Sequence, residues 1–107
     1  SRVIFFSSLA GSISMRGNLK HNKKFGNILY RISKSALNSM VKNIAYDFEN
    51  KHTIFSLHPG YLNIGSGGKD SDIESNYAIS KIIKVILSKN KINNGKFIDF
   101  KGNLIKW

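Results

Sequence analysis

The stretch "LYRISKSALNSMVKNIAYDF", residues 29–48, decides the fold, because its apolar residues recur at the spacing of an α-helix. Apolar strand-like segments flank it on both sides: "VIFF" at residues 3–6 and "TIFSL" at residues 53–57. The first is uninterrupted by polar residues, so we expect a strand covered on both faces, as in a parallel sheet. The helical stripe consists of Leu29, Ile32, Ala36, Leu37, Met40, Val41, Ile44, Ala45 and Phe48.

The second half of the chain repeats the alternation of strand and helix. Residues 75–88 have the pattern of an amphipathic helix, "NNG" at residues 93–95 predicts a turn, and "KFIDF" at residues 96–100 predicts a last strand. The order β-α-β-α-β predicts an α/β fold with two right-handed crossovers and three parallel strands, half of a doubly wound sheet. Ligands of such sheets bind beyond the carboxyl ends of the strands, where the loops after Phe6 and Leu57 emerge.

Length and composition limit the possible functions. The 107 residues suffice for one modest domain, and the absence of cysteine excludes disulfides and thiolate metal sites, so no metal is expected. The net charge of +11 comes mostly from lysines spread along the chain, with no basic cluster interleaved with aromatics. We therefore expect neither a nucleic-acid nor a membrane partner. The apolar runs are too short to span a bilayer, and a cytoplasmic location is expected.

Tyr30 and Lys34 stand four residues apart near the start of the predicted helix, so their side chains point the same way. A neighbouring ammonium favours the ionised form of a phenol. Such a phenol can give a proton to a carbonyl oxygen, or take one from an alcohol. A Tyr/Lys pair at this spacing is nevertheless common on helices, and by itself is more often structural.

Three motifs in order give the pair its context: "SSLAGS" at residues 7–12, "YRISKSALN" at residues 30–38 and "LHPG" at residues 57–60. With them, the chain resembles the C-terminal half of a short-chain dehydrogenase/reductase with a Rossmann-like sheet. It is most similar to the C-factor and sniffer-like carbonyl reductases, which also have a double glycine after the "LHPG" and a terminal strand closing in "G…W". The resemblance covers essentially all of the chain.

The resemblance implies a catalytic set of Ser8, Tyr30 and Lys34. Tyr30 would be the general acid/base, Lys34 would promote ionisation of the phenol and bind the nicotinamide ribose, and Ser8 would orient the substrate carbonyl. Ser7 is the less favoured alternative to Ser8. His58 is interpreted as a structural residue. The cofactor is NADP or NAD, with NADP favoured, and the implied cofactor-binding residues are Tyr30, Lys34, Pro59, Gly60, Asn63 and Ser66.

The sequence departs from the family pattern at Ile64, where relatives have a threonine that contacts the cofactor, and at Gly65, where they have an acid. The family's glycine-rich phosphate turn and its catalytic asparagine have no counterpart in residues 1–107. We therefore expect residues 1–107 to be the C-terminal catalytic half of one Rossmann-like domain, without its N-terminal dinucleotide-binding half. On its own this half is expected to fold poorly and to be inactive.

Two functions remain open at this stage. The leading hypothesis is an NAD(P)-dependent oxidoreductase that transfers hydride between nicotinamide and a small carbonyl or alcohol substrate. The alternative is a non-catalytic relative that acts through protein–protein contacts, because family resemblance does not guarantee activity. The long helix can serve a monomer core or a homo-oligomer interface, and the lysine-rich segment 12–28 is expected to border the substrate mouth.

Overall fold

The computed structural model describes residues 1–17, 27–60, 62–63, 73–88 and 93–107. Strand β1 (Arg2–Phe6) leads through the short 3-10 helix η1 (Leu9–Gly11) to helix α1 (Ile28–Asp47). Strand β2 (Thr53–His58) follows, then the two-residue strands β3 (Leu62–Asn63) and β4 (Ile73–Glu74), helix α2 (Ser75–Leu87) and strand β5 (Phe97–Asp99). The strands and helices predicted from the sequence are all present, whereas η1, β3 and β4 were not predicted.

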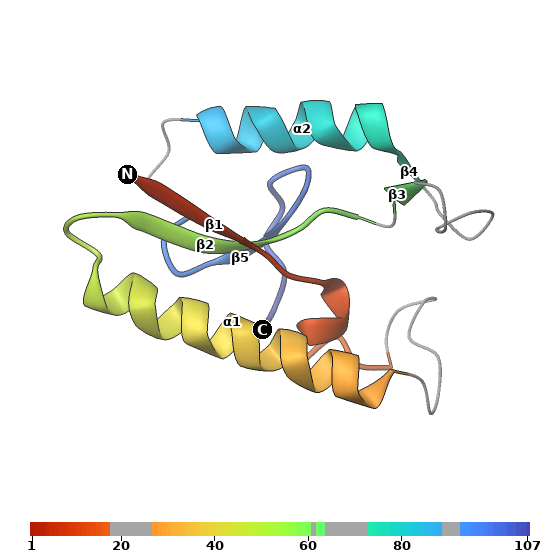
Figure 1. Ribbon diagram of the computed structural model, residues 1–107, viewed down its shortest axis with the longest axis horizontal. Coiled ribbons are helices and arrows are strands. Elements are labelled where there is room, and N and C mark those ends of the chain that lie inside the picture. The colour runs from red at the N-terminus through yellow and green to blue at the C-terminus, as the bar shows by residue number, and fades with distance from the viewer. Residues whose placement is uncertain (18–26, 61, 64–72, 89–92) are drawn as a thin grey trace.

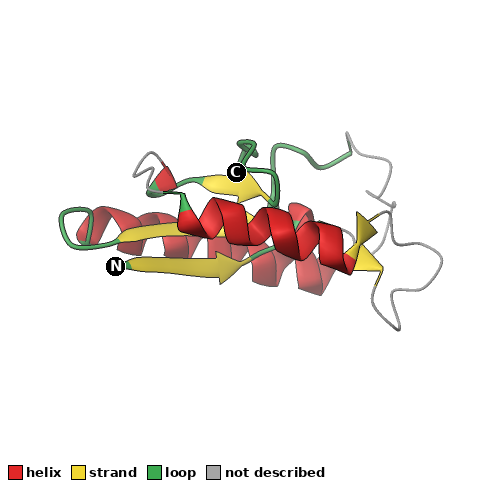
Figure 2. Cartoon of the chain, turned by 90° about the horizontal axis from the view of Figure 1, so that it is seen from above, coloured by secondary structure: helices red, strands yellow, loops and turns green. Residues whose placement is uncertain are grey.

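The main sheet has the order β1-β2-β5, and both pairs are parallel. Arg2 is in register with Thr53, and Ser56 with Phe97, so β2 lies at the centre. Helix α1 covers one face of this sheet and α2 the other, as Figures 1 and 2 show from two directions. The predicted α/β fold with three parallel strands is therefore confirmed.

The two longer strands differ in burial. Every residue of β2 is buried, but in β1 the side chains of Val3 and Phe6 are 39% and 53% exposed. The expectation that residues 3–6 are covered on both faces is therefore wrong for these two side chains. The reason is position: within the described part of the chain, β1 is the edge of the sheet and has a neighbour on one side, whereas β2 has one on each side.

The long helix α1 buries only part of its apolar stripe. It begins after Asn27, whose φ of 57° lies in the left-handed region that asparagine tolerates better than most residues. Val41 and Ala45 are fully buried against Ile54 of β2. Other members of the predicted stripe are exposed, among them Leu29 (79%) and Ile32 (58%). The periodicity thus predicted the helix, but not which part of its stripe would be covered.

The end of the chain returns to the beginning. The Trp107 ring stacks on Phe97 of β5, with centroids 5.6 Å apart. The Ser12 hydroxyl donates to the Lys106 carbonyl oxygen, and the Ile13 amide donates to the Trp107 carbonyl oxygen (2.6 Å). The segment after η1 is therefore held against the last residues of the chain.

Candidate active site

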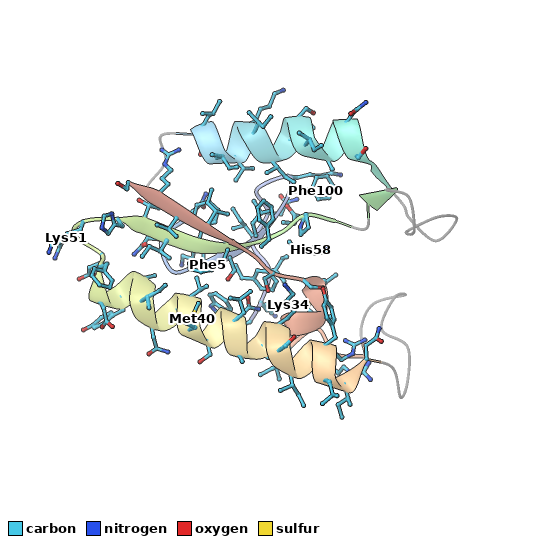
Figure 3. The ribbon with its side chains drawn as sticks, in the orientation of Figure 1. Phe5, Lys34, Met40, Lys51, His58 and Phe100 are labelled. Carbon is cyan, nitrogen blue, oxygen red and sulfur yellow. The ribbon has the colours of Figure 1, made fainter. Side chains whose placement is uncertain are left out.

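The candidate site lies where the carboxyl end of β1 meets the first turns of α1 (Figure 3). Lys34 donates from Nζ to the carbonyl oxygen of Phe6 (3.0 Å), the last residue of β1. The same Nζ lies 5.9 Å from the centroid of the Tyr30 ring, which is 47% exposed. One ammonium therefore contacts both the exposed phenol and the strand that leads to the two serines.

The two serines after β1 have different environments. Ser7 is 4% exposed, and its amide donates to the Leu57 carbonyl oxygen (2.8 Å), so its backbone extends the pairing of β1 with β2. Ser8 is half-buried and caps η1, where its Oγ accepts from the Ala10 amide (3.2 Å). A hydroxyl that accepts in this way still has its own O–H to donate.

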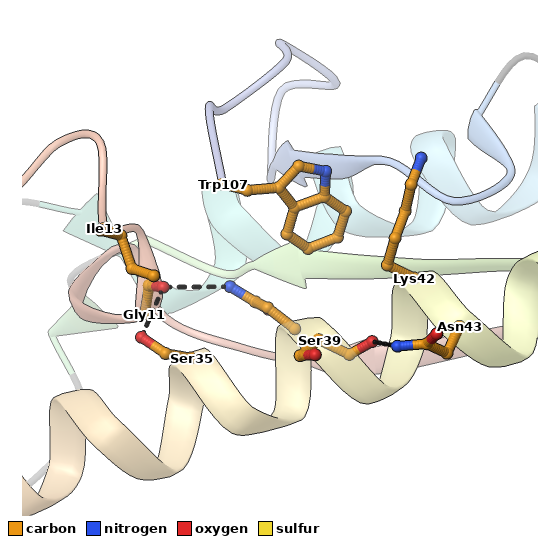
Figure 4. Close-up of a pocket in the computed structure, with 8 residues that line it drawn as sticks. Gly11, Ile13, Ser35, Ser39, Lys42, Asn43 and Trp107 are labelled. Atoms are coloured by element: carbon orange, nitrogen blue, oxygen red, sulfur yellow. Dashed lines mark hydrogen bonds between the residues drawn. The ribbon is translucent and has the colours of Figure 1, made fainter.

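Gly11 packs the serine loop, residues 7–12, onto α1. Its carbonyl oxygen accepts from Ser35 Oγ (2.9 Å) and from Asn38 Nδ2 (3.5 Å), as Figure 4 shows. A Cβ at Gly11 would lie 2.9 Å from the carbonyl carbon and from Cβ of Lys34, too close for any side chain. Gly11, Ser35 and Asn38 lie in the motifs at residues 7–12 and 30–38, but no role was predicted for them from the sequence. The glycine three residues after the double serine was the usable signal.

His58 joins the end of β2 to the same loop. It is 7% exposed, and its Nδ1 accepts from the Leu9 amide (3.2 Å). Burial lowers the pKa of His58 to about 4, against the opposing effect of the Asp99 carboxylate, which raises it. The ring is therefore neutral at pH 7. Because Nδ1 is the acceptor, the proton of the neutral ring is on Nε2.

The predicted cofactor-binding residues are described only in part. Pro59 and Gly60 follow β2 directly and are half-buried, and Gly60 has a φ of +89°, a conformation that glycine adopts without strain. Asn63 ends β3. Ser66 and the departures at Ile64 and Gly65 lie outside the described residues.

Two cavities lie beside the serine loop, and neither is lined by Ser8, Tyr30 or Lys34. One has a volume of about 200 Å³ and is the pocket of Figure 4, between η1, α1 and Trp107. The other, about 470 Å³, is largely apolar and lies between the segment after η1 and the first turns of α1. Its lining residues are Ala10, Ser12, Ile13, Arg16, Ile28, Arg31, Ile32, Ser35 and Ala36.

The described ranges hold neither a metal-binding cluster nor a helix that could span a membrane. In those ranges, no group of three or more His, Asp or Glu side chains could hold a metal ion. Neither α1 nor α2, the two long helices that the structure describes, has the length and apolar character needed to cross a membrane.

Comparison with known proteins gives consistent results. No protein-family model matches the chain. It is 30% identical over 95 residues to the C-signal protein of Myxococcus xanthus, an alignment that covers 88% of this chain and 57% of the relative. Among solved structures, the Sniffer carbonyl reductase of D. melanogaster matches all of the chain at 30% identity with a TM-score of 0.86. A carbonyl reductase from chicken fatty liver, solved with NADPH, matches at 26% identity with a TM-score of 0.84.

These similarities confirm the resemblance drawn from the motifs. In fold and in sequence, the chain is similar to part of the short-chain dehydrogenases/reductases, of the kind represented by the sniffer-like carbonyl reductases and the C-signal protein. Its parallel sheet with a helix on each face matches part of the Rossmann-like fold of these carbonyl reductases. The chain spans 57% of the length of the C-signal protein and 41% to 43% of the two carbonyl reductases, so it covers about half of its relatives or less.

Proposed function

We propose that this chain is the catalytic half of an NAD(P)-dependent carbonyl reductase or alcohol dehydrogenase. The observation that carries the proposal is the position of the Lys34 ammonium, 5.9 Å from the Tyr30 ring and 3.0 Å from the last carbonyl oxygen of β1. The same ammonium thus contacts the phenol ring of α1 and the end of the strand that leads to Ser8. An acid/base group, a cation and a hydroxyl at one sheet edge are the parts that carbonyl reduction requires.

In the direction of reduction, Tyr30 gives its phenolic proton to the substrate carbonyl oxygen while the carbonyl carbon receives a hydride. The C=O bond becomes an alcohol, and Tyr30 is left as a phenolate. A cation at about the distance of Lys34 stabilises that phenolate. Ser8 donates its O–H to the same carbonyl oxygen, because the bond that its Oγ accepts from the Ala10 amide leaves this donor available. The reverse sequence oxidises an alcohol.

The residues present fit a nicotinamide cofactor, which when bound supplies or accepts the hydride. Lys34 has three N–H donors and one is directed at Phe6, so it has capacity for ribose hydroxyls. Gly60, in its left-handed conformation directly after β2, allows close approach of the backbone to a ligand. Tyr30, Pro59, Asn63 and Ser66 complete the proposed set. The bound NADPH of the chicken carbonyl reductase supports NADP over NAD.

The edge of the sheet supports the proposal that a dinucleotide-binding half completes the domain. Among the strands that the structure describes, β1 pairs only with β2, and Val3 and Phe6 are exposed beside its other edge. An exposed apolar strand edge favours pairing with a further strand. We propose that a preceding segment of the intact protein adds parallel strands there. The site would then lie at the carboxyl edge of the completed sheet and take a small carbonyl or alcohol substrate.

The first test is Tyr30→Phe in the intact protein, assayed by NADPH oxidation with a panel of aldehydes and ketones. Loss of the proton donor should lower kcat by a factor of about 100 to 10,000 and leave the circular dichroism spectrum unchanged. Tyr46→Phe is the matched control, because Tyr46 is on the same helix, 75% exposed and four turns away. Equal rates for Tyr30→Phe and the native protein would overturn the proposal.

A second test compares two lysines of α1 by calorimetry with NADPH. Lys34 and Lys42 both donate to a backbone carbonyl oxygen, of Phe6 and Gly95 respectively. Lys34→Met should weaken cofactor binding about 10- to 100-fold through the loss of charged hydrogen bonds, whereas Lys42→Met should not change it. An intact protein that binds no nicotinamide would instead favour a non-catalytic role in protein contacts.

A further inference from the structure

We infer that His58 is a positioning residue for the catalytic serine: its ring accepts the amide proton of Leu9 and so fixes the peptide unit that follows Ser8. The inference rests on the proposed function. It differs from the sequence-based interpretation of His58, which gave the residue a structural role only.

The geometry links His58 to Ser8 through one peptide. The Leu9 nitrogen that donates to Nδ1 (3.2 Å) belongs to the peptide bond between Ser8 and Leu9, so the hydrogen bond fixes the plane containing the Ser8 carbonyl. The next amide, of Ala10, donates to Ser8 Oγ (3.2 Å). Consecutive amides of η1 therefore fix first the backbone and then the hydroxyl of Ser8.

The loop is held from a second side as well. The carbonyl oxygen of Gly11 accepts from Ser35 of α1 (2.9 Å), two residues after the contact with His58. Strand β2 and helix α1 thus hold opposite ends of η1. Because α1 also carries Tyr30 and Lys34, the contact with His58 fixes the serine relative to the sheet, and the contact with Ser35 fixes it relative to the acid/base pair. Catalytic geometry of this kind is sensitive to displacements of an ångström.

A neutral histidine is suited to this role. Nδ1 can accept from Leu9 only while it carries no proton. Two influences on the ring oppose each other: burial favours the neutral form, and the carboxylate of Asp99, in register with His58 on β5, favours the charged form. Burial is the larger effect. Asparagine offers an acceptor at the place of Nδ1, because its Oδ1 is attached at the same Cγ position.

The test measures kcat and KM of the intact protein with His58→Leu and His58→Asn. The leucine variant removes the acceptor and should lower kcat about 10- to 100-fold with little change in KM, because Ser8 is displaced rather than lost. The asparagine variant should restore most of the rate. Unchanged kcat in His58→Leu, or an equal loss in both variants, would overturn the inference. If His58→Leu does not fold, His58→Gln replaces it, since its amide lies one methylene farther from the backbone.

A double-mutant cycle with Ser8→Ala separates positioning from general stability. If His58 acts through Ser8, His58→Leu should cause no further loss of kcat when Ser8 is already alanine. If the factors by which the two substitutions lower kcat multiply in the double variant, His58 acts independently of Ser8 and the inference is overturned. A native protein without any carbonyl turnover would overturn both proposals. Turnover that is abolished by Tyr30→Phe but untouched by His58→Leu would overturn this one alone.

Discussion

The two faces of the central sheet are held by different kinds of contact. On the α2 side, Phe55, Leu57, Ala78, Ile82, Ile98 and Phe100 form one apolar cluster. On the α1 side the cluster is smaller, with Val41, Ala45 and Ile54, and hydrogen bonds to backbone groups surround it. The α2 side therefore contributes mainly apolar burial, and the α1 side adds directional contacts.

The face with more hydrogen bonds is also the face that carries the proposed catalytic residues. Apolar burial stabilises without fixing direction, whereas a hydrogen bond constrains both distance and angle. All three proposed catalytic residues lie on the α1 side. Tyr30 and Lys34 are in α1, and Ser8 is in the serine loop that packs against α1. The contacts from Lys34 to Phe6, from Ser35 to Gly11 and from His58 to Leu9 fix that loop and that helix. Stability and site geometry should therefore respond to different substitutions.

The largest effect is expected from Phe55→Ala on the α2 side. Phe55 is 2% exposed within the apolar cluster, and its truncation should lower the free energy of unfolding by about 3–5 kcal/mol. Urea denaturation of the intact protein measures this. Ile83→Ala is the control, because Ile83 is 48% exposed on α2 and should cost far less. Similar losses in the two variants would contradict an apolar core beneath α2.

The pH dependence of stability tests the α1 side next. The pKa of His58 is lowered from 6.5 to about 4 in the folded state, so between these values the unfolded chain binds more protons. Stability contributed by the neutral ring is thus complete above pH 6.5 and is lost as pH falls to about 4, in total about 3 kcal/mol. Denaturation at several pH values should show this loss. In His58→Asn the corresponding part of the pH dependence should be absent, and its persistence would assign the effect to other groups.

Features that depend on local residue spacing were predicted from the sequence. Features that depend on contacts between distant segments were not. Spacing was enough to predict α1 and α2, and to place Tyr30 and Lys34 on one side of the helix. Burial of β1 could not be predicted, since it depends on which strands are neighbours. The contact of His58 with Leu9 joins residues 49 positions apart, and that of Ser35 with Gly11 joins residues 24 apart. Neither has a periodicity that a sequence pattern reveals.

Asn94 offers a smaller test of the α1 side. Its Oδ1 accepts from the Ile54 amide (2.8 Å), and its Nδ2 donates to the Ala45 carbonyl oxygen (3.0 Å), so one side chain bridges β2 and the end of α1. Asn94→Ala removes both hydrogen bonds and should cost about 2 kcal/mol in urea denaturation. Asn43→Ala is the control, because the exposed Asn43 side chain donates only to the Ser39 carbonyl oxygen within α1 (2.8 Å), and it should cost far less. Equal losses in the two variants would argue against the bridge.

The smallest stability effect, and the sharpest separation of the two faces, is expected from Ser35→Ala. The variant loses one hydrogen bond to the Gly11 carbonyl oxygen, worth about 1 kcal/mol, and Asn38 Nδ2 still donates to the same oxygen. Ser80→Ala on α2 is the control, since its hydroxyl donates to Tyr77 within its own helix (2.7 Å). Both variants should remain folded, but only Ser35→Ala should lower kcat, because only Ser35 ties the serine loop to the helix of Tyr30. If kcat fell equally in both, the hydrogen bonds of α1 would have no special part in the chemistry, and the contrast between the faces would concern stability alone.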